Sequence, residues 1–265
     1  MWRFRKFSLG LVRPQTVTAL LAALLVIGGF LLSPKIIRPA QVASVPIIRP
    51  ISPHMVKAAA IELPAPLDCG KVPCIALTFD DGPSPEITPQ VLDILDRHHV
   101  KATFFLIGSR VPGNEALLRR MHADGQEIGN HSWSHRDMTT LSPDEVEQEV
   151  SQTQQVIAAA GVPVPRLFRP PYGAVDEMVR SHVPLTVLAW NVDPEDWNTK
   201  KPQKIIDEVL SHAKPGAIVD MHDIRQPSAD ALDPILTSLE QSYRIVTVSQ
   251  LLDIPSGQPG VFYGR

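Results

Sequence analysis

The sequence predicts an α/β protein whose parallel strands form a sheet that is either open or closed into a barrel. The first observation is that, after residue 74, short apolar segments alternate with segments of helical periodicity, which is typical of repeated βαβ units. The second is that 265 residues with 44% hydrophobic content can bury one substantial core. We therefore expect a single folded domain over residues 67–254, preceded by an amino-terminal membrane segment.

Residues 1–32 have the composition of a membrane or export signal. Four basic residues in the first fifteen precede an uncharged, largely apolar run over residues 16–32. This run exceeds the ~7–15 residues of a signal-peptide core and is at the lower end of the ~17–25 that span a bilayer. No small-x-small cleavage site follows directly, which favours an uncleaved anchor with a cytoplasmic basic tail over a removed signal peptide. The domain would then lie outside the cytoplasm at the cell membrane, or be secreted if the segment is cleaved.

The next segment, residues 33–66, reads as a linker. Eight prolines lie between residues 33 and 73, without helical or strand periodicity, which is typical of a semi-rigid tether. Residues 1–66 carry a net charge of +7 and the remainder −10. An acidic folded part disfavours a nucleic-acid partner, which requires a basic face. Residues 255–265 are expected to form a carboxyl-terminal tail.

The two cysteines, Cys69 and Cys74, flank a Gly/Pro turn just before the first predicted strand. Outside the cytoplasm such a pair favours a disulfide. Two free thiols or part of a metal site remain alternatives, although no second pair or nearby histidine supports a metal.

The domain itself divides into alternating elements. The apolar segments predict strands over residues 74–79, 101–108, 126–130, 166–168, 185–190, 216–222 and 244–248. The amphipathic segments predict helices over residues 84–99, 114–125, 142–161, 175–181, 202–213 and 233–243. Pro85 marks the first helix start, and Ser142 with Glu145 forms a capping box at the third.

Residues able to carry chemistry follow the predicted strands. These groups are Asp80 and Asp81, His131 and His135, Arg169, Asp193 and Asp196, and His222. Because the carboxyl ends of parallel strands form one rim of an α/β barrel, we expect the groups to converge on one site.

The adjacent pair Asp80 and Asp81 needs a break in strand geometry, since consecutive strand residues point to opposite faces. Gly82 and Pro83 supply that break, although Asp-Gly alone is also common in surface turns. His131 and His135, four residues apart, could share one ion with a carboxylate. Two histidines and one aspartate suit a catalytic zinc with open positions, and the second aspartate is then free to act as a base.

Five motifs in order and spacing resemble those of the NodB-like polysaccharide deacetylases, carbohydrate esterase family four. They are "TFDDGP", "HSWSH", "RPPY", "DPEDW" and the pair His222-Asp223, within residues 69–252. The "CGKVPC" segment also resembles secreted bacterial members. The resemblance implies a single distorted (β/α) barrel and a metal-dependent hydrolase that removes N-acetyl groups from N-acetylglucosamine polymers such as peptidoglycan or chitin-like chains.

Carried over by position, the resemblance implies a role for each site residue. Asp80 would be the general base, oriented by Arg169, and His222 the general acid, held charged by Asp196. The metal ligands would be Asp81, His131 and His135, binding a divalent ion, with zinc favoured and cobalt or another ion possible. The backbone N–H of Tyr172 would stabilise the oxyanion, and Trp197 would wall the substrate groove.

The chain departs from the family pattern at Asp220, where leucine is usual, and in a shorter segment between Tyr172 and Trp190. Strand alternation places Asp220 on the same side as His222. It would therefore either raise the pKa of His222 from within the substrate pocket or pair with a buried basic residue and stabilise the barrel.

Three alternatives to the deacetylase remain. An acetylxylan esterase would use the same residues, whereas a catalytically silent sugar-binding protein would need none of the acid, base and metal positions that are all present here. A small-molecule amidohydrolase fits the export signal poorly. The expected partners are an acetylated glycan and the membrane, with a monomeric protein and no nucleic acid.

Overall fold

The computed structural model describes residues 67–254 and the backbone of residues 261–262. The predicted anchor or signal sequence (1–32), the linker (33–66) and most of the tail (255–265) lie outside these residues. Within the described ranges, no helix is both long enough and apolar enough to cross a bilayer.

The described chain alternates strands and helices as the sequence predicts. The strands are β1 (Cys74–Asp80), β2 (Thr103–Leu106), β3 (Glu127–Asn130), β4 (Leu167–Phe168), β5 (Thr186–Leu188), β6 (Ile218–His222), β7 (Arg244–Val246) and β8 (Val261–Phe262). The α-helices are α1 (Thr88–Arg97), α2 (Glu115–Ala123), α3 (Pro143–Ala159), α4 (Glu177–His182), α5 (Pro202–His212), α6 (Gln226–Leu239) and α7 (Val248–Leu252). Short 3-10 turns η1 to η4 follow β2, β3, β4 and β5.

The strands form one parallel sheet in the order β6-β1-β2-β3-β4-β5-β8, with β7 beside the first half of β1. An isolated bridge between Val192, just after β5, and Val219 brings the segment that follows β5 alongside β6. The result is a half-barrel of parallel strands, so the predicted α/β class is confirmed. Part of the predicted tail, β8, adds to the edge at β5.

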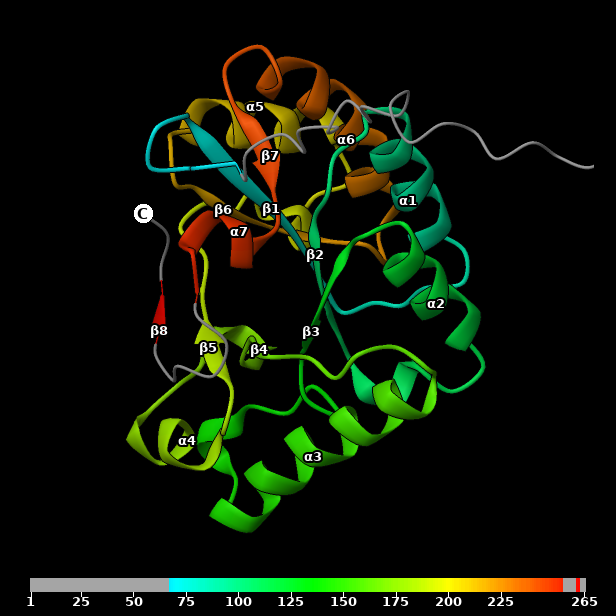
Figure 1. Ribbon diagram of the computed structural model, residues 1–265, viewed down its shortest axis with the longest axis vertical. Coiled ribbons are helices and arrows are strands. Elements are labelled where there is room, and N and C mark those ends of the chain that lie inside the picture. Colours follow the sequence, from blue (N-terminus) through cyan, green and yellow to red (C-terminus); the bar gives the residue numbers. More distant parts are fainter. Residues whose placement is uncertain (1–66, 255–260, 263–265) are drawn as a thin grey trace, which may run out of the picture. The chain divides into compact units, whose positions relative to one another are not determined.

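The helices surround these strands, with α1, α2, α3 and α4 following one another around the outside (Figure 1). All seven residues of β1 are buried, because the sheet is covered on both faces. Phe79 and Phe104 stack at 5.1 Å between ring centroids and join β1 to β2 within the largest apolar core. Asp80 therefore lies at the carboxyl end of a fully buried strand.

Several predicted boundaries are wrong, and three of them have a clear physical reason. Helix α1 begins at Thr88 with Pro89 in its first turn, because residues 84–87 form the turn that precedes it. Helix α6 begins at Gln226 and contains Pro234, so it starts well before the predicted residue 233. The buried apolar face of α6 stabilises it despite the backbone hydrogen bond that an internal proline removes.

The last predicted strand also ends early, at Val246, because Thr247 caps a helix. Its side chain accepts from the N–H of Gln250, and Gln250 reciprocates in a capping box that begins α7. The equivalent prediction of Ser142 with Glu145 at α3 is confirmed.

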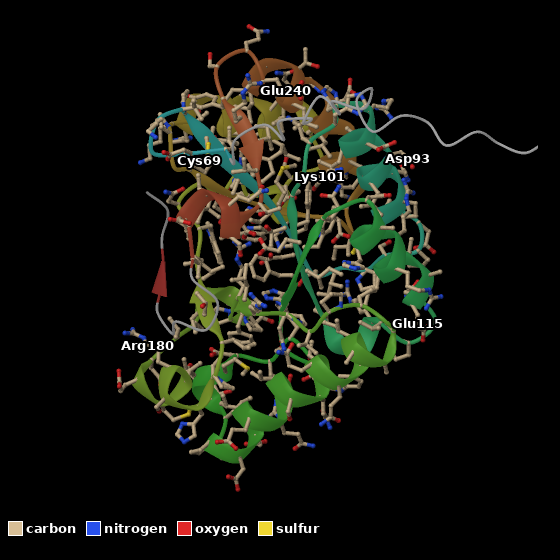
Figure 2. All side chains as sticks on the ribbon, in the orientation of Figure 1. Cys69, Asp93, Lys101, Glu115, Arg180 and Glu240 are labelled. Carbon is tan, nitrogen blue, oxygen red and sulfur yellow. A yellow bond between two sulfur atoms is a disulfide. The ribbon has the colours of Figure 1, made fainter. Side chains whose placement is uncertain are left out.

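A disulfide joins Cys69 to Cys74, which confirms the favoured reading over free thiols or a metal pair. It closes the short turn that leads into β1. Figure 2 shows Cys69 beside the start of β1, while the charged side chains labelled Asp93, Glu115 and Arg180 project outward from the periphery. The disulfide therefore lies at the amino end of β1, opposite the end that carries the two aspartates.

Candidate functional site

The carboxyl ends of the strands open into a cavity of about 410 Å³. Its lining collects most of the predicted site residues, together with Trp190, which was not predicted: Asp80, Asp81, His131, His135, Tyr172, Asp193, Trp197, Asp220 and His222. Arg169 and Asp196 are fully buried just behind this lining. The sequence prediction that the strand-end groups meet at one place is therefore confirmed in geometry.

The two adjacent aspartates separate because the backbone leaves the strand at Asp81. Asp80 is the last residue of β1, whereas Asp81 has a left-handed conformation with φ of 71°. The next residue, Gly82, lies against a buried carboxylate, since a Cβ there would come within 2.4 Å of Asp223 Oδ1. The break thus begins at Asp81 itself, and Gly82 allows the close approach that follows.

Asp81 faces the two histidines after β3. Its Oδ1 lies 3.2 Å from His135 Nε2 and 3.6 Å from His131 Nε2, and one ligand atom from each residue lies within 4.8 Å of the others. Asp81 Oδ1 is buried and makes no hydrogen bond within the described part of the chain. An orphaned carboxylate oxygen facing two imidazole nitrogens is the donor set expected for a divalent cation, so the residues fit such an ion.

The orientation of His131 supports this fit. Its Nδ1–H donates to the backbone oxygen of Arg169 at 2.7 Å, which leaves the Nε2 lone pair directed at the cluster. A backbone carbonyl behind a ligand histidine is a common way to fix the tautomer. For His135, burial and the neighbouring His131 lower the pKa and favour the neutral, ligating form.

The loop that carries both histidines is irregular. Ser132 and His135 have φ of 65° and 59°, a conformation that costs free energy for residues with a side chain. The carboxylate of Glu149, on α3, accepts from the N–H groups of Trp133 and Ser134 at 2.8 Å each and from the Ser134 hydroxyl at 2.5 Å. Glu149 therefore holds the loop in shape. Sequence reasoning missed it, because it lies far from "HSWSH" along the chain.

Asp80 connects the histidines to a second cluster around Arg169, because its Oδ2 lies 3.6 Å from His131 Nε2 while its Oδ1 faces the guanidinium. Nη1 of this buried guanidinium lies 2.8 Å from Asp80 Oδ1, 2.8 Å from Asp220 Oδ1 and 2.7 Å from Thr78 Oγ1. Its Cζ lies 4.2 Å from the centroid of the Phe105 ring, a cation–π contact. Asp220 therefore has the buried basic partner that one of the two sequence readings expects. Burial, followed by the charge of Asp80, raises the pKa of Asp220 well above its ordinary value.

A third cluster joins His222, at the end of β6, to Asp196. The Nδ1–H of His222 donates to Asp196 Oδ1 at 2.7 Å, and its backbone N–H donates to Oδ2 at 2.8 Å. The hydroxyl of Ser228, at the start of α6, also donates to Oδ2. Burial opposes the charge on the imidazole, but the hydrogen bond and charge of Asp196 outweigh it and raise the pKa of His222 to about 10. The imidazole is therefore protonated at neutral pH.

Two buried polar residues near these clusters were not predicted to have a role. Asp223 hydrogen-bonds to the Thr88 hydroxyl, which in turn accepts from the N–H of Ser84 at 2.8 Å. Burial raises the pKa of Asp223 to about 7. These hydrogen bonds link the loop after Asp81 to Asp223, the residue that follows His222. The signal for Asp223 was present in the sequence, since it is part of the last motif.

The rim of the cavity is aromatic. Tyr172 and Trp197 are 69% and 50% exposed, unusual values for such large side chains. Tyr172 has φ of 60° and stacks edge-on against His135 at 4.7 Å between centroids. Its neighbour Gly173 lies under Trp190, where a Cβ would come within 3.1 Å of the ring. Exposed aromatic faces beside a cavity suit the apolar faces of sugar rings.

Another cavity, of about 540 Å³, lies between α3 and α4. It is larger than the strand-end cavity but contains none of the three clusters, and its lining is mainly aliphatic and amide side chains. The chemistry therefore belongs to the strand-end cavity.

The half-barrel and its three clusters define a class of α/β protein, one with a donor set that fits a divalent metal and adjoining titratable groups at the carboxyl edge of a parallel sheet. Residues 68–185 match the family model described as polysaccharide deacetylase. Over 187 residues the chain is 39% identical to the peptidoglycan-N-acetylglucosamine deacetylase of Bacillus cereus, covering 67% of this chain and 87% of that protein. The chain belongs to the polysaccharide deacetylase family.

Two further relatives extend this comparison. The chain is 45% identical over 181 residues to the peptidoglycan-N-acetylmuramic acid deacetylase PdaC of Bacillus subtilis, covering 68% of this chain. The match takes in 39% of PdaC, so the chain spans about two fifths of that relative's length. A solved family 4 acetyl xylan esterase from Clostridium thermocellum, in complex with a cobalt ion, superimposes with a TM-score of 0.66 at 36% identity, covering 69% of this chain and 94% of that one.

Proposed function

We propose that the chain is a metal-dependent hydrolase that removes N-acetyl groups from polysaccharides containing N-acetylglucosamine. One observation carries the proposal: the two adjacent carboxylates serve different clusters. Asp81 faces both His131 and His135, whereas Asp80 pairs with Arg169 at 2.8 Å and approaches only His131, at 3.6 Å. A ligand set, a separate base and a protonated acid are the groups that amide hydrolysis needs.

Asp81, His131 and His135 would hold the divalent ion, which we propose to be zinc, with cobalt as the alternative. When bound, such an ion polarises a carbonyl oxygen and lowers the pKa of a coordinated water to about 7. The buried Asp81 Oδ1, which has no hydrogen bond within the described residues, supports the ligand assignment. The His131 hydrogen bond to the Arg169 carbonyl supports it independently.

The remaining residues move protons. Asp80 accepts the proton of the water that attacks the carbonyl carbon, and Arg169 holds the carboxylate in place at 2.8 Å. His222 donates a proton to the leaving amine, for which its raised pKa is suited because the charged form is present at neutral pH. General acid and base groups of this kind each contribute about 10²–10⁴ in rate.

The rim positions the substrate. Tyr172 lines the cavity and has a left-handed backbone, and its backbone N–H would donate to the oxyanion, a contact typically worth about 2.7–4 kcal/mol. Trp197 offers an exposed ring to the sugar. Because the rim is open and the clusters are buried, the polymer would lie across the mouth with its acyl group directed inward.

Peptidoglycan or a chitin-like chain is the substrate that we propose. The names of the Bacillus cereus and Bacillus subtilis relatives support peptidoglycan. An acetylxylan esterase with the same site is the runner-up, favoured by the likeness to the Clostridium thermocellum esterase. A catalytically silent sugar-binding protein is disfavoured, since no acid, base or ligand position is missing.

We also propose an extracytoplasmic location, with residues 16–32 as the membrane anchor. The basic amino terminus and apolar run support this, as does the disulfide between Cys69 and Cys74, a bond that persists in oxidising compartments.

The test is acetate release by the purified full chain from peptidoglycan, chitooligosaccharides and acetylxylan side by side. We expect release from the N-acetylated polymers, loss after chelation, and recovery on adding zinc or cobalt. Release from acetylxylan alone would favour the esterase, and no release from any polymer with metal restored would reject the enzyme.

A further inference from the structure

We propose that Asp220 makes this site prefer N-hydroxyacetyl (glycolyl) glucosamine units over N-acetyl units. The inference rests on the proposed function and names the acyl group that the pocket fits best. It begins with the position of Asp220 in the half-barrel.

Asp220 lies one layer below the reacting groups. In the register of the sheet, Asp80 pairs with His222 and Thr78 pairs with Asp220. Two residues along a strand correspond to about 6–7 Å on the same face. Asp220 thus lines the cavity on the same side as His222, but deeper, and is only 4% exposed.

The substrate's own bonds direct the acyl tail toward this layer. The carbonyl carbon carries an oxygen, a nitrogen and the acyl carbon. The oxygen faces the ligand set and Tyr172, while the nitrogen faces His222 and the sugar at the rim. The acyl carbon must therefore point to the remaining wall, and Asp220 and Trp190 are the lining residues not yet assigned to the other two directions or to the rim.

The chemistry of that wall suits a hydroxyl better than a methyl. Asp220 Oδ1 accepts from Arg169 at 2.8 Å. Its Oδ2 has no hydrogen bond within the described residues and belongs to a side chain that lines the cavity. An acetyl methyl would cover this oxygen and leave it unpaired. A hydroxyl on the acyl carbon would donate to it, and sites that hydrogen-bond a substrate hydroxyl discriminate strongly against analogues that lack it.

The reaction itself is unchanged. The amide C–N bond breaks, water supplies a hydroxyl to the acyl carbon and a proton to the amine, and the products are hydroxyacetate and a free amino sugar. No co-reactant beyond water is required, so one assay of released amine serves both substrates.

The experiment compares kcat/KM for chitotetraose carrying N-hydroxyacetyl or N-acetyl groups, using the metal-loaded full chain. We expect the native protein to favour the hydroxyacetyl substrate at least about tenfold, as one good hydrogen bond implies. Asp220→Leu should abolish this preference, because the methyl then meets an apolar wall. Asp220→Asn should keep part of it, since a hydroxyl can both donate and accept. Asp193→Asn, on the rim of the same cavity, is the matched control and should leave the ratio unchanged.

A second measurement needs no variant and covers the case in which Asp220→Leu does not fold. Free hydroxyacetate should inhibit the native protein at a concentration at least about fivefold lower than acetate, because each product occupies the acyl pocket. Equal efficiency on both substrates and equal inhibition by both acids would overturn this inference and leave the deacetylase standing. Failure to release amine from either substrate would overturn both.

Discussion

The two sides of the half-barrel hold their reactive groups by different means. On one side β1 and β6 pair over five residues and carry Asp80 and His222 directly at their ends. On the other side β3 and β4 share a single residue pair, and the histidines lie on the irregular loop that follows β3. The proposed proton-transfer groups are thus placed by a backbone ladder, whereas the two histidines proposed as metal ligands depend on side-chain hydrogen bonds such as those of Glu149. Substitutions on the β1–β6 side should therefore alter proton transfer, whereas substitutions on the β3–β4 side should alter metal affinity.

The largest effects on activity should come from replacing the adjacent carboxylates Asp80 and Asp81 one at a time. Asp81→Ala should lose bound metal and activity together, because it removes one of three ligands. Asp80→Asn should keep the metal and lose about 10²–10⁴ in kcat, the usual contribution of a general base. Metal content by atomic emission, measured with turnover on the same samples, separates the two. Near-normal turnover of Asp80→Asn would show that the base lies elsewhere.

Glu149→Gln tests the other side, where an irregular loop after β3 carries His131 and His135. The amide can replace only part of the three hydrogen bonds that hold the loop, so we expect metal affinity to fall about 10–100-fold, as for other supporting residues behind metal ligands. The exposed Glu147, on the same helix, provides the control Glu147→Gln. Competition with a chromogenic chelator gives both dissociation constants. If they agree, the loop does not depend on Glu149.

Asp196→Asn tests the β1–β6 side through the pH dependence of turnover. The pKa of His222 is raised to about 10, so its charged form adds stability that is complete below pH 6.5 and is lost as pH rises through about 10. Without Asp196, the pKa should fall toward 6.5, and the alkaline limb of the kcat profile should move down with it. Metal affinity should stay the same. An unmoved alkaline limb in a folded variant would mean that His222 is not the acid.

The smallest effect on function should come from the opposite end of the sheet. Replacing Cys69 and Cys74 by serine removes a short closed loop and should cost about 2 kcal/mol of stability by the chain-entropy relation. Thermal unfolding should register this change. Neither kcat nor metal affinity should move, because the strand ends that carry the site lie at the other end of β1. A loss of turnover at unchanged metal content would show that the two ends are coupled.

The parts of the site that could be predicted were those that local sequence patterns indicate. Alternation of apolar segments predicted the parallel sheet, and residues directly after strands predicted Asp80, Asp81, His131, His135 and His222. Glu149 could not be found in this way, because an acidic residue on an amphipathic helix has the pattern of a solvated face. The contact between Arg169 and Asp220 joins residues 51 positions apart and depends on the register of β6 against β1. Left-handed backbone at Asp81 and His135 has only a weak residue signature, since aspartate and histidine adopt it more often than most residues but far less readily than glycine.

The shared position of Arg169 has a consequence for proton movement during turnover. Its Nη1 carries two hydrogens but has three oxygen atoms within 2.8 Å, on Asp80, Asp220 and Thr78. The Thr78 hydroxyl has its own hydrogen committed to the Val219 carbonyl, so it can only accept from Nη1. The three acceptors therefore compete for two donors. When Asp80 takes up a proton, it becomes a weaker hydrogen-bond acceptor for Arg169. The Nη1–H groups can then donate to Asp220, so the buried guanidinium does not lose its partner. Asp220 thus keeps an oxygen acceptor beside the guanidinium while Asp80, the proposed base, gains and loses a proton.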